Sequence, residues 1–191
     1  MIASFQRQYM SPEAYLAWEP LQEDRYEYID GEVFAMTGGT KPHNRIAFNL
    51  ASVLDGHLTG RCEVYISDVK VQVTARGPYH YPDVVVSFDP RDQNTNQLIC
   101  HPCLIAEVLS PSTEAMDRGE KFRRYRQAES LREYLLVQAD QKGLDCFRKS
   151  EMGLWVLQGY EAEDELVIET LGLTVPVEAL YRQVRFEADV P

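Results

Sequence analysis

The chain has 191 residues and a formal net charge of −11 at neutral pH, with 45% hydrophobic and 26% charged residues. This length suits a single domain, since domains usually contain roughly 100 to 200 residues. No apolar run approaches the roughly 18 residues of a membrane helix and no export signal is visible, so we expect a cytoplasmic protein without a membrane partner. The acidic charge argues against general attraction to phosphate backbones, although residues 121–126 form a local basic cluster.

Local signals predict the elements of the N-terminal third. Ser11 followed by a proline is typical of a capped helix start, and Asp30-Gly31 between two apolar runs is typical of a two-residue hairpin turn. From Lys41 to Leu58 apolar residues recur at helical spacing, which predicts a long helix. His43 falls on its apolar side and should point inward, either as a core or capping histidine or as part of a site.

Three apolar runs predict the central strands. The run 62–73 changes its apolar side near Asp68, which predicts a bulge or twist within one strand. The runs 81–88 and 103–109 are apolar on both faces, which predicts two buried strands. The stretch 114–128 follows turn and cap residues and predicts a second helix.

The C-terminal part reads as strands. The run 133–137 predicts another strand, and three further apolar runs predict a closing antiparallel meander: 144–147, 154–157 and 166–168. Together the elements predict one α/β (α+β) domain over residues 1–191, with a core of about 10–185. We expect a mixed central sheet flanked by helices, with an antiparallel extension at the C-terminal end.

The pair Cys100 and Cys103 has the CxxC spacing of zinc and redox sites. A second ligand pair at zinc spacing is missing, and Cys103 opens an apolar strand. We therefore expect free thiols.

Glu107 is the most informative residue, because it is the only ionisable group in an otherwise apolar strand. An unpaired carboxylate there would cost several kcal/mol or stay protonated. Asp83 begins the preceding buried strand, and antiparallel neighbours place a strand start beside a strand end. Converging carboxylates suit Mg²⁺ or Mn²⁺. The alternative is structural: Asp83 caps a turn and Glu107 pairs with an arginine.

The pattern resembles a known nuclease superfamily. Tyr81-Pro82-Asp83 followed by Glu107-Val108-Leu109 is similar to the PD-(D/E)xK motif of restriction-endonuclease-like proteins. Further segments over roughly residues 10–185 resemble the Uma-two family of bacterial endonucleases: 26–33, His43 with Ile46 and Leu50, 107–113, Asp117, Lys121 and Tyr125. The resemblance implies a restriction-endonuclease-like fold.

The sequence departs from the superfamily motif at Leu109, which stands where the motif lysine should be. In the resembled family the following helix supplies this lysine, which points to Lys121. Asp117 and Tyr125 are four residues away on either side and share its helix face. The alternative for Lys121 is an exposed ion pair with Asp117.

The resemblance implies a Mg²⁺- or Mn²⁺-dependent endonuclease acting on DNA. It assigns the metal to Asp83, Glu107 and the Val108 backbone carbonyl, and it gives Lys121 the role of orienting the attacking water or stabilising the transition state. It gives supporting roles to four residues: Glu27, His43, Asp117 and Tyr125. The basic cluster offers Arg123, Arg124 and Arg126 as nucleic-acid contacts, and we expect a homodimer. The alternative is an inactive nuclease fold that acts as a binding or regulatory module.

Overall fold

The computed structural model describes residues 9–36, 38–58, 60 and 62–186. The helices are α1 (Pro12–Trp18), α2 (Lys41–Leu58), α3 (Glu114–Met116), α4 (Phe122–Tyr125) and α5 (Val177–Leu180), with 3-10 turns at Glu19–Leu21, Asp92–Asn94 and Glu169–Leu171 and a π-helical turn at Asp117–Lys121. The strands are β1 (Tyr26–Ile29), β2 (Glu32–Ala35), β3 (Glu63–Ile66), β4 (Lys70–Gln72), β5 (Tyr79–His80), β6 (Val84–Ser87), β7 (Leu98–Ile99), β8 (Leu104–Val108), β9 (Glu133–Val137), β10 (Gly143–Lys149), β11 (Trp155–Glu161), β12 (Glu165–Ile168) and β13 (Leu173–Pro176). None of the helices described is long and apolar enough to cross a membrane.

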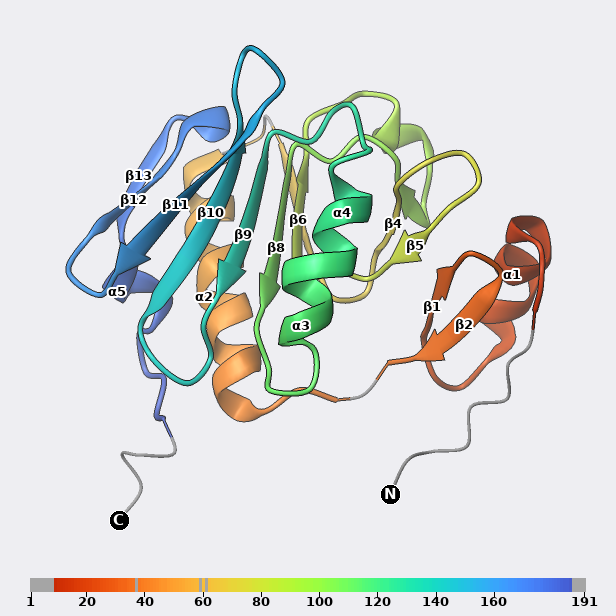
Figure 1. Ribbon diagram of the computed structural model, residues 1–191, viewed down its shortest axis with the longest axis horizontal. Helices are drawn as coiled ribbons and strands as arrows, with labels where there is room; N and C mark the ends of the chain where they lie inside the picture. Colours follow the sequence, from red (N-terminus) through yellow and green to blue (C-terminus); the bar gives the residue numbers. More distant parts are fainter. Residues whose placement is uncertain (1–8, 37, 59, 61, 187–191) are drawn as a thin grey trace.

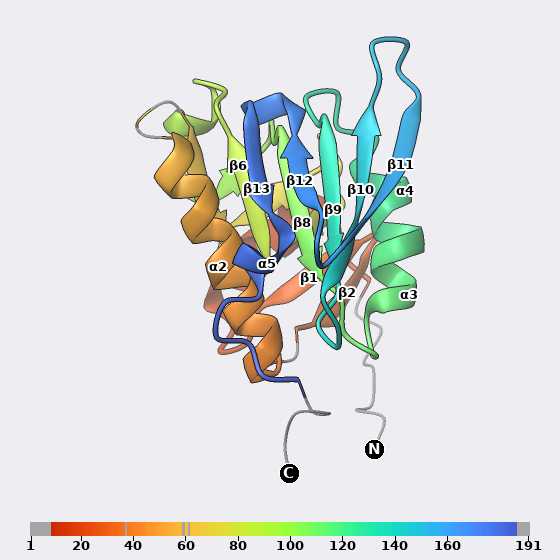
Figure 2. The ribbon, with the colours of Figure 1, turned by 90° about the vertical axis from the view of Figure 1, so that its left-hand side faces the viewer.

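The largest sheet has six strands in the order β11-β10-β9-β8-β6-β3. Only β8 and β9 are parallel, so the sheet is mixed as predicted. Helix α2 covers one face, together with β12, β13 and α5, while α3 and α4 cover the other (Figures 1 and 2). Side chains alternate between the faces of a strand, so Val84 packs toward α2 and Val85 packs toward α4.

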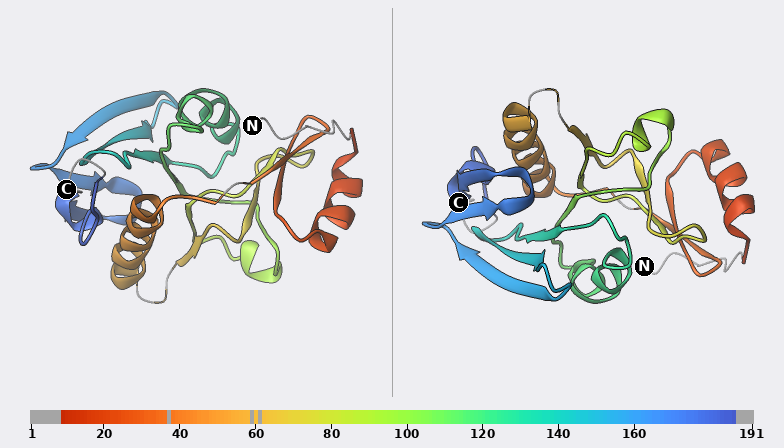
Figure 3. Two further views of the ribbon diagram at one scale, coloured as in Figure 1. Left: turned by 90° about the horizontal axis from the view of Figure 1, so that it is seen from below. Right: turned by 90° about the horizontal axis from the view of Figure 1, so that it is seen from above.

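A second sheet, in the order β2-β1-β5-β4-β7, lies at one end of the molecule with α1 against it (Figure 3). Its own small core is built around three buried tyrosines: Tyr15, Tyr28 and Tyr79. The predicted hairpin is present, and Asp30 (φ 50°) and Gly31 (φ 96°) both adopt the positive φ that its turn requires. The predicted start of α1 and both predicted bounds of α2 also agree with the structure.

Three expectations about the strands and helices were wrong. The run 62–73 is not one bulged strand, because the chain turns at Ser67 (φ 45°) and β3 and β4 join different sheets. The helix expected over 114–128 ends at Tyr125 and contains the π-helical turn. The meander stops at β11, since β12 pairs with β13 in a separate two-stranded sheet.

Candidate active site

Asp83 and Glu107 meet because antiparallel neighbouring strands carry them. Val84 of β6 pairs with Ala106 of β8, so the next residues along, Asp83 and Glu107, fall opposite each other. Alternation along the strand puts both on the face that Ile105 shares, which α4 covers. The start of one strand therefore lies beside the end of the other.

Two donors hold the carboxylate of Asp83. Its Oδ2 accepts a hydrogen bond of 2.7 Å from the backbone N–H of Val108 and lies 3.1 Å from Nε2 of His43, in the first turn of α2. Burial lowers the pKa of His43, but the hydrogen bond and negative charge of Asp83 outweigh this effect, so that the pKa is raised. His43 thus points inward, toward the predicted metal ligand.

Glu107 is 3% exposed and receives two hydrogen bonds on one oxygen. Its Oε1 accepts from Nζ of Lys121 at 3.1 Å and from the hydroxyl of Tyr125 at 3.0 Å. The partners of Glu107 are therefore a lysine and a tyrosine, and not the arginine of the structural alternative.

The ammonium of Lys121 lies among three carboxylates. Its Nζ is 3.1 Å from Oε1 of Glu107, 3.2 Å from Oε1 of Glu27 and 3.5 Å from Oδ1 of Asp117. Burial lowers the pKa of Lys121, but the three carboxylates outweigh it and hold the pKa well above its usual value. Lys121 is 8% exposed, so it is not the surface partner of Asp117 that spacing alone allowed.

The π-helical turn Asp117–Lys121 gives this part of the chain its geometry. Such widened turns are rare and occur frequently at functional sites. Here the turn presents Asp117 and Lys121 toward the sheet, one turn before Tyr125. The hydroxyl of Tyr134 in β9 donates a 3.0 Å hydrogen bond to the carbonyl of Asp117 and fixes the turn from below.

Glu27 reaches the same place from the second sheet. Its Oε1 accepts a 3.2 Å hydrogen bond from the backbone N–H of Tyr81, and its Oε2 lies 3.1 Å from Nδ1 of His80. Burial raises the pKa of Glu27, but Lys121 and His80 outweigh it and lower the pKa to about 2. Glu27 is therefore a buried, ionised carboxylate.

Carboxyl groups are concentrated in this cluster. Three of them, from Glu27, Glu107 and Asp117, surround the ammonium of Lys121, and Asp83 lies opposite Glu107 on the neighbouring strand. Burial first, and then the neighbouring carboxylates, raise the pKa of Glu107 well above its usual range. Burial also raises the pKa of Asp117, whose Oδ1 is buried without a hydrogen-bond partner in the described part of the chain.

These observations fit a hard divalent cation. All the donors are oxygens, and Oδ1 of Asp117 is buried with no hydrogen bond and only the 3.5 Å ion pair with Lys121. Among the described residues, no three His, Cys, Asp or Glu side chains are already grouped as a metal site. In this arrangement the Lys121 ammonium lies between the carboxylates instead.

The three arginines expected to contact nucleic acid differ from one another. Arg124 is 8% exposed and forms ion pairs with Asp30 and Glu120, so its guanidinium ties the β1–β2 hairpin to α4. Arg123 is exposed and pairs with Glu120. Arg126 is exposed and lies over the ring of Phe122, 5.9 Å from its centroid.

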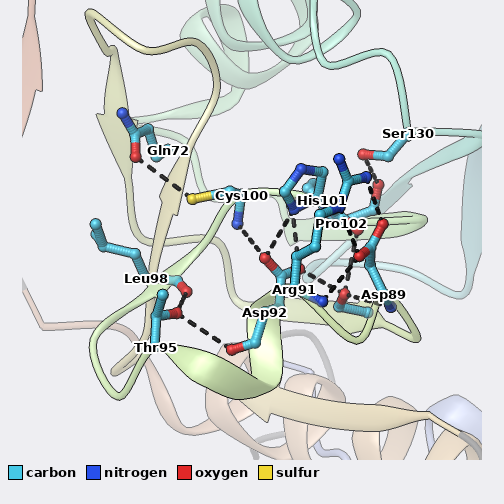
Figure 4. Close-up of polar contacts among 11 residues, drawn as sticks. Gln72, Asp89, Arg91, Asp92, Thr95, Leu98, Cys100, His101, Pro102 and Ser130 are labelled. Carbon is cyan, nitrogen blue, oxygen red and sulfur yellow. Dashed lines mark hydrogen bonds and ion pairs between the residues drawn. The ribbon is translucent and has the colours of Figure 1, made fainter.

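The CxxC cysteines do not form a metal site with each other. Sγ of Cys100 donates to Oε1 of Gln72 (Figure 4), whereas Sγ of Cys103 donates to the carbonyl of Val86. Beside them the buried carboxylate of Asp92 accepts hydrogen bonds from the backbone N–H of His101 and the hydroxyl of Ser87. This loop cluster borders a cavity of about 740 Å³, at the end of β6 and β8 opposite to Asp83 and Glu107.

His80 is the main residue that sequence reasoning missed. It is fully buried, contacts Glu27, and meets the ring of Tyr125 edge-on at 5.2 Å. It lies three residues before Asp83, between two tyrosines of a run that otherwise reads as apolar. A histidine so close to the motif was the available signal.

Comparison with known proteins places this geometry in a family. The model of the Uma2 family, described as "Putative restriction endonuclease", matches residues 12–178. The Synechocystis sp. protein slr1290 is 44% identical over 178 residues, covering 93% of this chain and 94% of that protein, and its relative sll1609 from the same organism is 34% identical over 157 residues, covering 79% and 89%. A crystal structure from Anabaena variabilis, described as a putative nuclease belonging to DUF820, superposes with a TM-score of 0.76 at 16% identity, over 92% of this chain and 99% of that one. The protein therefore belongs to the Uma2 family and has the mixed α+β fold of that nuclease structure.

Proposed function

We propose that this protein is a Mg²⁺-dependent endonuclease that hydrolyses phosphodiester bonds in DNA, with Mn²⁺ as a substitute metal. The observation that carries the proposal is the pairing of Asp83 and Glu107 at adjacent strand ends, with Lys121 of the following helix on Glu107. The family description supports a nuclease-like function. The arrangement of Asp83, Glu107 and Lys121 fits a PD-(D/E)xK site whose lysine has moved to the helix.

Each residue of the cluster has a role in this proposal. Asp83, Glu107 and the backbone carbonyl of Val108 would hold the metal, which supplies Lewis acidity and an activated water when bound. Lys121 places a fixed positive charge where the negative charge of the phosphate group grows during hydrolysis. Tyr125 holds Glu107 in position through its hydroxyl.

His43 and Glu27 complete the arrangement. His43 orients Asp83 through its Nε2 contact, and its raised pKa favours the protonated ring beside that carboxylate. Glu27 adds a carboxylate next to Lys121 that remains ionised. Within the basic cluster 121–126, the exposed cations that could contact the DNA backbone are Arg126 and Arg123, the latter paired with Glu120. We expect a homodimer, because two copies of one site can cut two strands.

A second candidate function is that of a binding or regulatory protein without cleavage. The net charge of −11 favours it, because an acidic protein gains little from general attraction to phosphates. Divalent metal binding without cleavage of any nucleic acid would be its signature.

The test is calorimetric titration of Mn²⁺ into wild type, Asp83→Asn and Glu107→Gln, with plasmid cleavage measured on the same samples. Asp68→Asn is the matched control, because Asp68 is an exposed carboxylate that forms an ion pair with Arg25. We expect binding and cleavage in wild type and the control only. If the two site variants bind Mn²⁺ as wild type does, the proposed ligands are wrong. If wild type binds Mn²⁺ but does not cleave the plasmid, the second candidate function holds.

A further inference from the structure

The outer edge of β11 differs from the other sheet edges in the described part of the chain. β11 has seven residues and ends the six-stranded sheet, whereas the other edge strands, β2, β3, β7, β12 and β13, have only two to four. From Trp155 to Tyr160 it carries no charge and no proline. Soluble proteins usually protect edges by shortness, charge or proline, because the unpaired N–H and C=O groups accept another strand.

Apolar side chains are exposed along this edge on both faces of the sheet. Ten large hydrophobic residues are exposed in the described part of the chain, and five of them gather here: Met152, Leu154, Val156, Leu157 and Val167. Leu157 pairs with Phe147 and lies on the α4 face, while Val156 pairs with Arg148, whose guanidinium donates to the Val167 carbonyl on the opposite face. A strand added at this edge would cover apolar surface on both faces, which a partner docking on one face would not do.

Charge along the edge favours a second copy of this chain as the added strand. Trp155, at the start of β11, pairs with Lys149 in β10, while Glu161 ends the strand. Antiparallel pairing of two identical β11 strands about a twofold axis brings Lys149 of one copy toward Glu161 of the other. The middle of the strand is uncharged, so two chains of net charge −11 can meet there without like charges in contact.

We propose that β11 is the dimer interface of this protein, through antiparallel pairing of β11 with β11 of a second copy into one continuous sheet. The strip is shorter than the roughly 20 to 30 residues per partner of a standard interface, so the dimer should dissociate at low micromolar concentration. In Figure 2 the β10–β11 hairpin extends beyond the rest of the sheet. The inference deepens the homodimer expectation of the proposed function by naming its interface, and it does not require nuclease activity.

The test is sedimentation velocity of the full chain from about 1 to 100 µM in EDTA, where neither metal nor DNA contributes. We compare wild type with Leu157→Lys and Val156→Lys, one on each face of the edge. Ile66→Lys is the matched control, because Ile66 is 45% exposed on β3, the opposite edge strand of the same sheet. Circular dichroism and melting curves establish that all variants are folded.

We expect a concentration-dependent dimer for wild type and Ile66→Lys, and a dissociation constant raised at least about tenfold in both β11 variants. A wild type that stays monomeric at 100 µM would overturn the proposal. So would β11 variants that dimerise as well as Ile66→Lys, since the dimer would then use another surface. Glu107→Gln, which removes the proposed cleavage, should leave this equilibrium unchanged, so the two proposals can fail separately.

Discussion

The stability of the Glu107→Gln variant distinguishes a functional role of the Glu107 carboxylate from a structural one. Glutamine keeps the shape and an oxygen that can accept from Lys121 and Tyr125, but it removes one of the three buried carboxyl groups around the ammonium of Lys121. Burial and the neighbouring carboxylates raise the pKa of Glu107, so ionisation there opposes folding when no metal is bound. We expect the free energy of unfolding of Glu107→Gln to lie between that of wild type and about 1 kcal/mol above it. Cleavage should be lost.

Lys121→Met removes the positive charge of the cluster, whereas Glu107→Gln removes a carboxylate. It removes the ammonium that lies among Glu27, Glu107 and Asp117. Removing one partner of a buried ion pair costs about 3–5 kcal/mol, which lowers the Tm of a chain of this size by about 6–20 °C. Adding Glu107→Gln to this variant should restore part of the loss, because the two substitutions act on one contact.

The assay is urea denaturation at pH 8 in EDTA, with Glu133→Gln as the control. Glu133 is also fully buried, but it is satisfied by Arg148 and by the backbone N–H groups of Glu169 and Thr170. Its substitution should cost about 3 kcal/mol, because it breaks a complete buried pair. If Glu107→Gln loses as much stability as Glu133→Gln, Glu107 is a structural residue and the reasoning fails.

Three further predictions follow from individual contacts. Burial raises the pKa of both Cys103 and Cys146 to about 12, so neither thiol should react with Ellman's reagent at pH 8 until urea unfolds the chain; rapid reaction of all four cysteines in the native protein would contradict this. Hydrogen bonds from Arg123 and Arg124 lower the pKa of Glu120 from 4.5 to about 2, so its stabilising effect is present above pH 4.5 and is lost as the pH falls through about 2. Glu120→Gln should therefore lower the Tm more at pH 6 than at pH 2, and an equal effect at both values would refute the linkage. The buried amide of Asn49 donates to the carbonyls of Leu180 and Arg182, so Asn49→Leu should cost about 2 kcal/mol in denaturant unfolding, and a neutral result would show that these carbonyls find other partners.

The features predicted correctly from sequence depend on near neighbours in the chain. The hairpin at Asp30-Gly31 needs only a turn that accepts positive φ, and α2 needs only apolar residues at helical spacing. The opposition of Asp83 and Glu107 followed from one further assumption, that two successive buried strands pair antiparallel. For these residues, local pattern and tertiary structure agree.

The features that were missed depend on contacts far apart in sequence. Whether β3 and β4 continue one strand is decided by which sheet each one joins, which periodicity in the run 62–73 cannot show. The burial of Lys121 depends on Glu27, which lies 94 residues earlier in another sheet. The same holds for Arg124, whose partner Asp30 is also 94 residues away. Local spacing left an exposed ion pair with Asp117 open as the alternative for Lys121, and it made Arg124 look like a surface contact for nucleic acid.

The neutralised arginines change how DNA binding should depend on conditions. Sequence suggested that the basic cluster 121–126 attracts DNA, but Lys121, Arg123 and Arg124 are paired with carboxylates, and only for Arg126 is no ion pair recorded among the described residues of the cluster. Salt-dependent affinity for phosphate requires cations that are free to replace counterions. A chain of net charge −11 should therefore bind DNA weakly unless a divalent cation offsets its buried carboxylates.

Fluorescence anisotropy of a labelled duplex at about 150 mM salt measures this dependence, with Ca²⁺ as a hard cation that takes the same oxygen ligands. We expect affinity in Ca²⁺ to exceed that in EDTA by at least about tenfold, and Arg126→Ala to change it less than Asp83→Asn does. Equal affinity in EDTA and Ca²⁺ would mean that DNA is held by a surface away from the carboxylates. In that case the carboxylates around Lys121 would contribute to cleavage but not to the affinity for DNA.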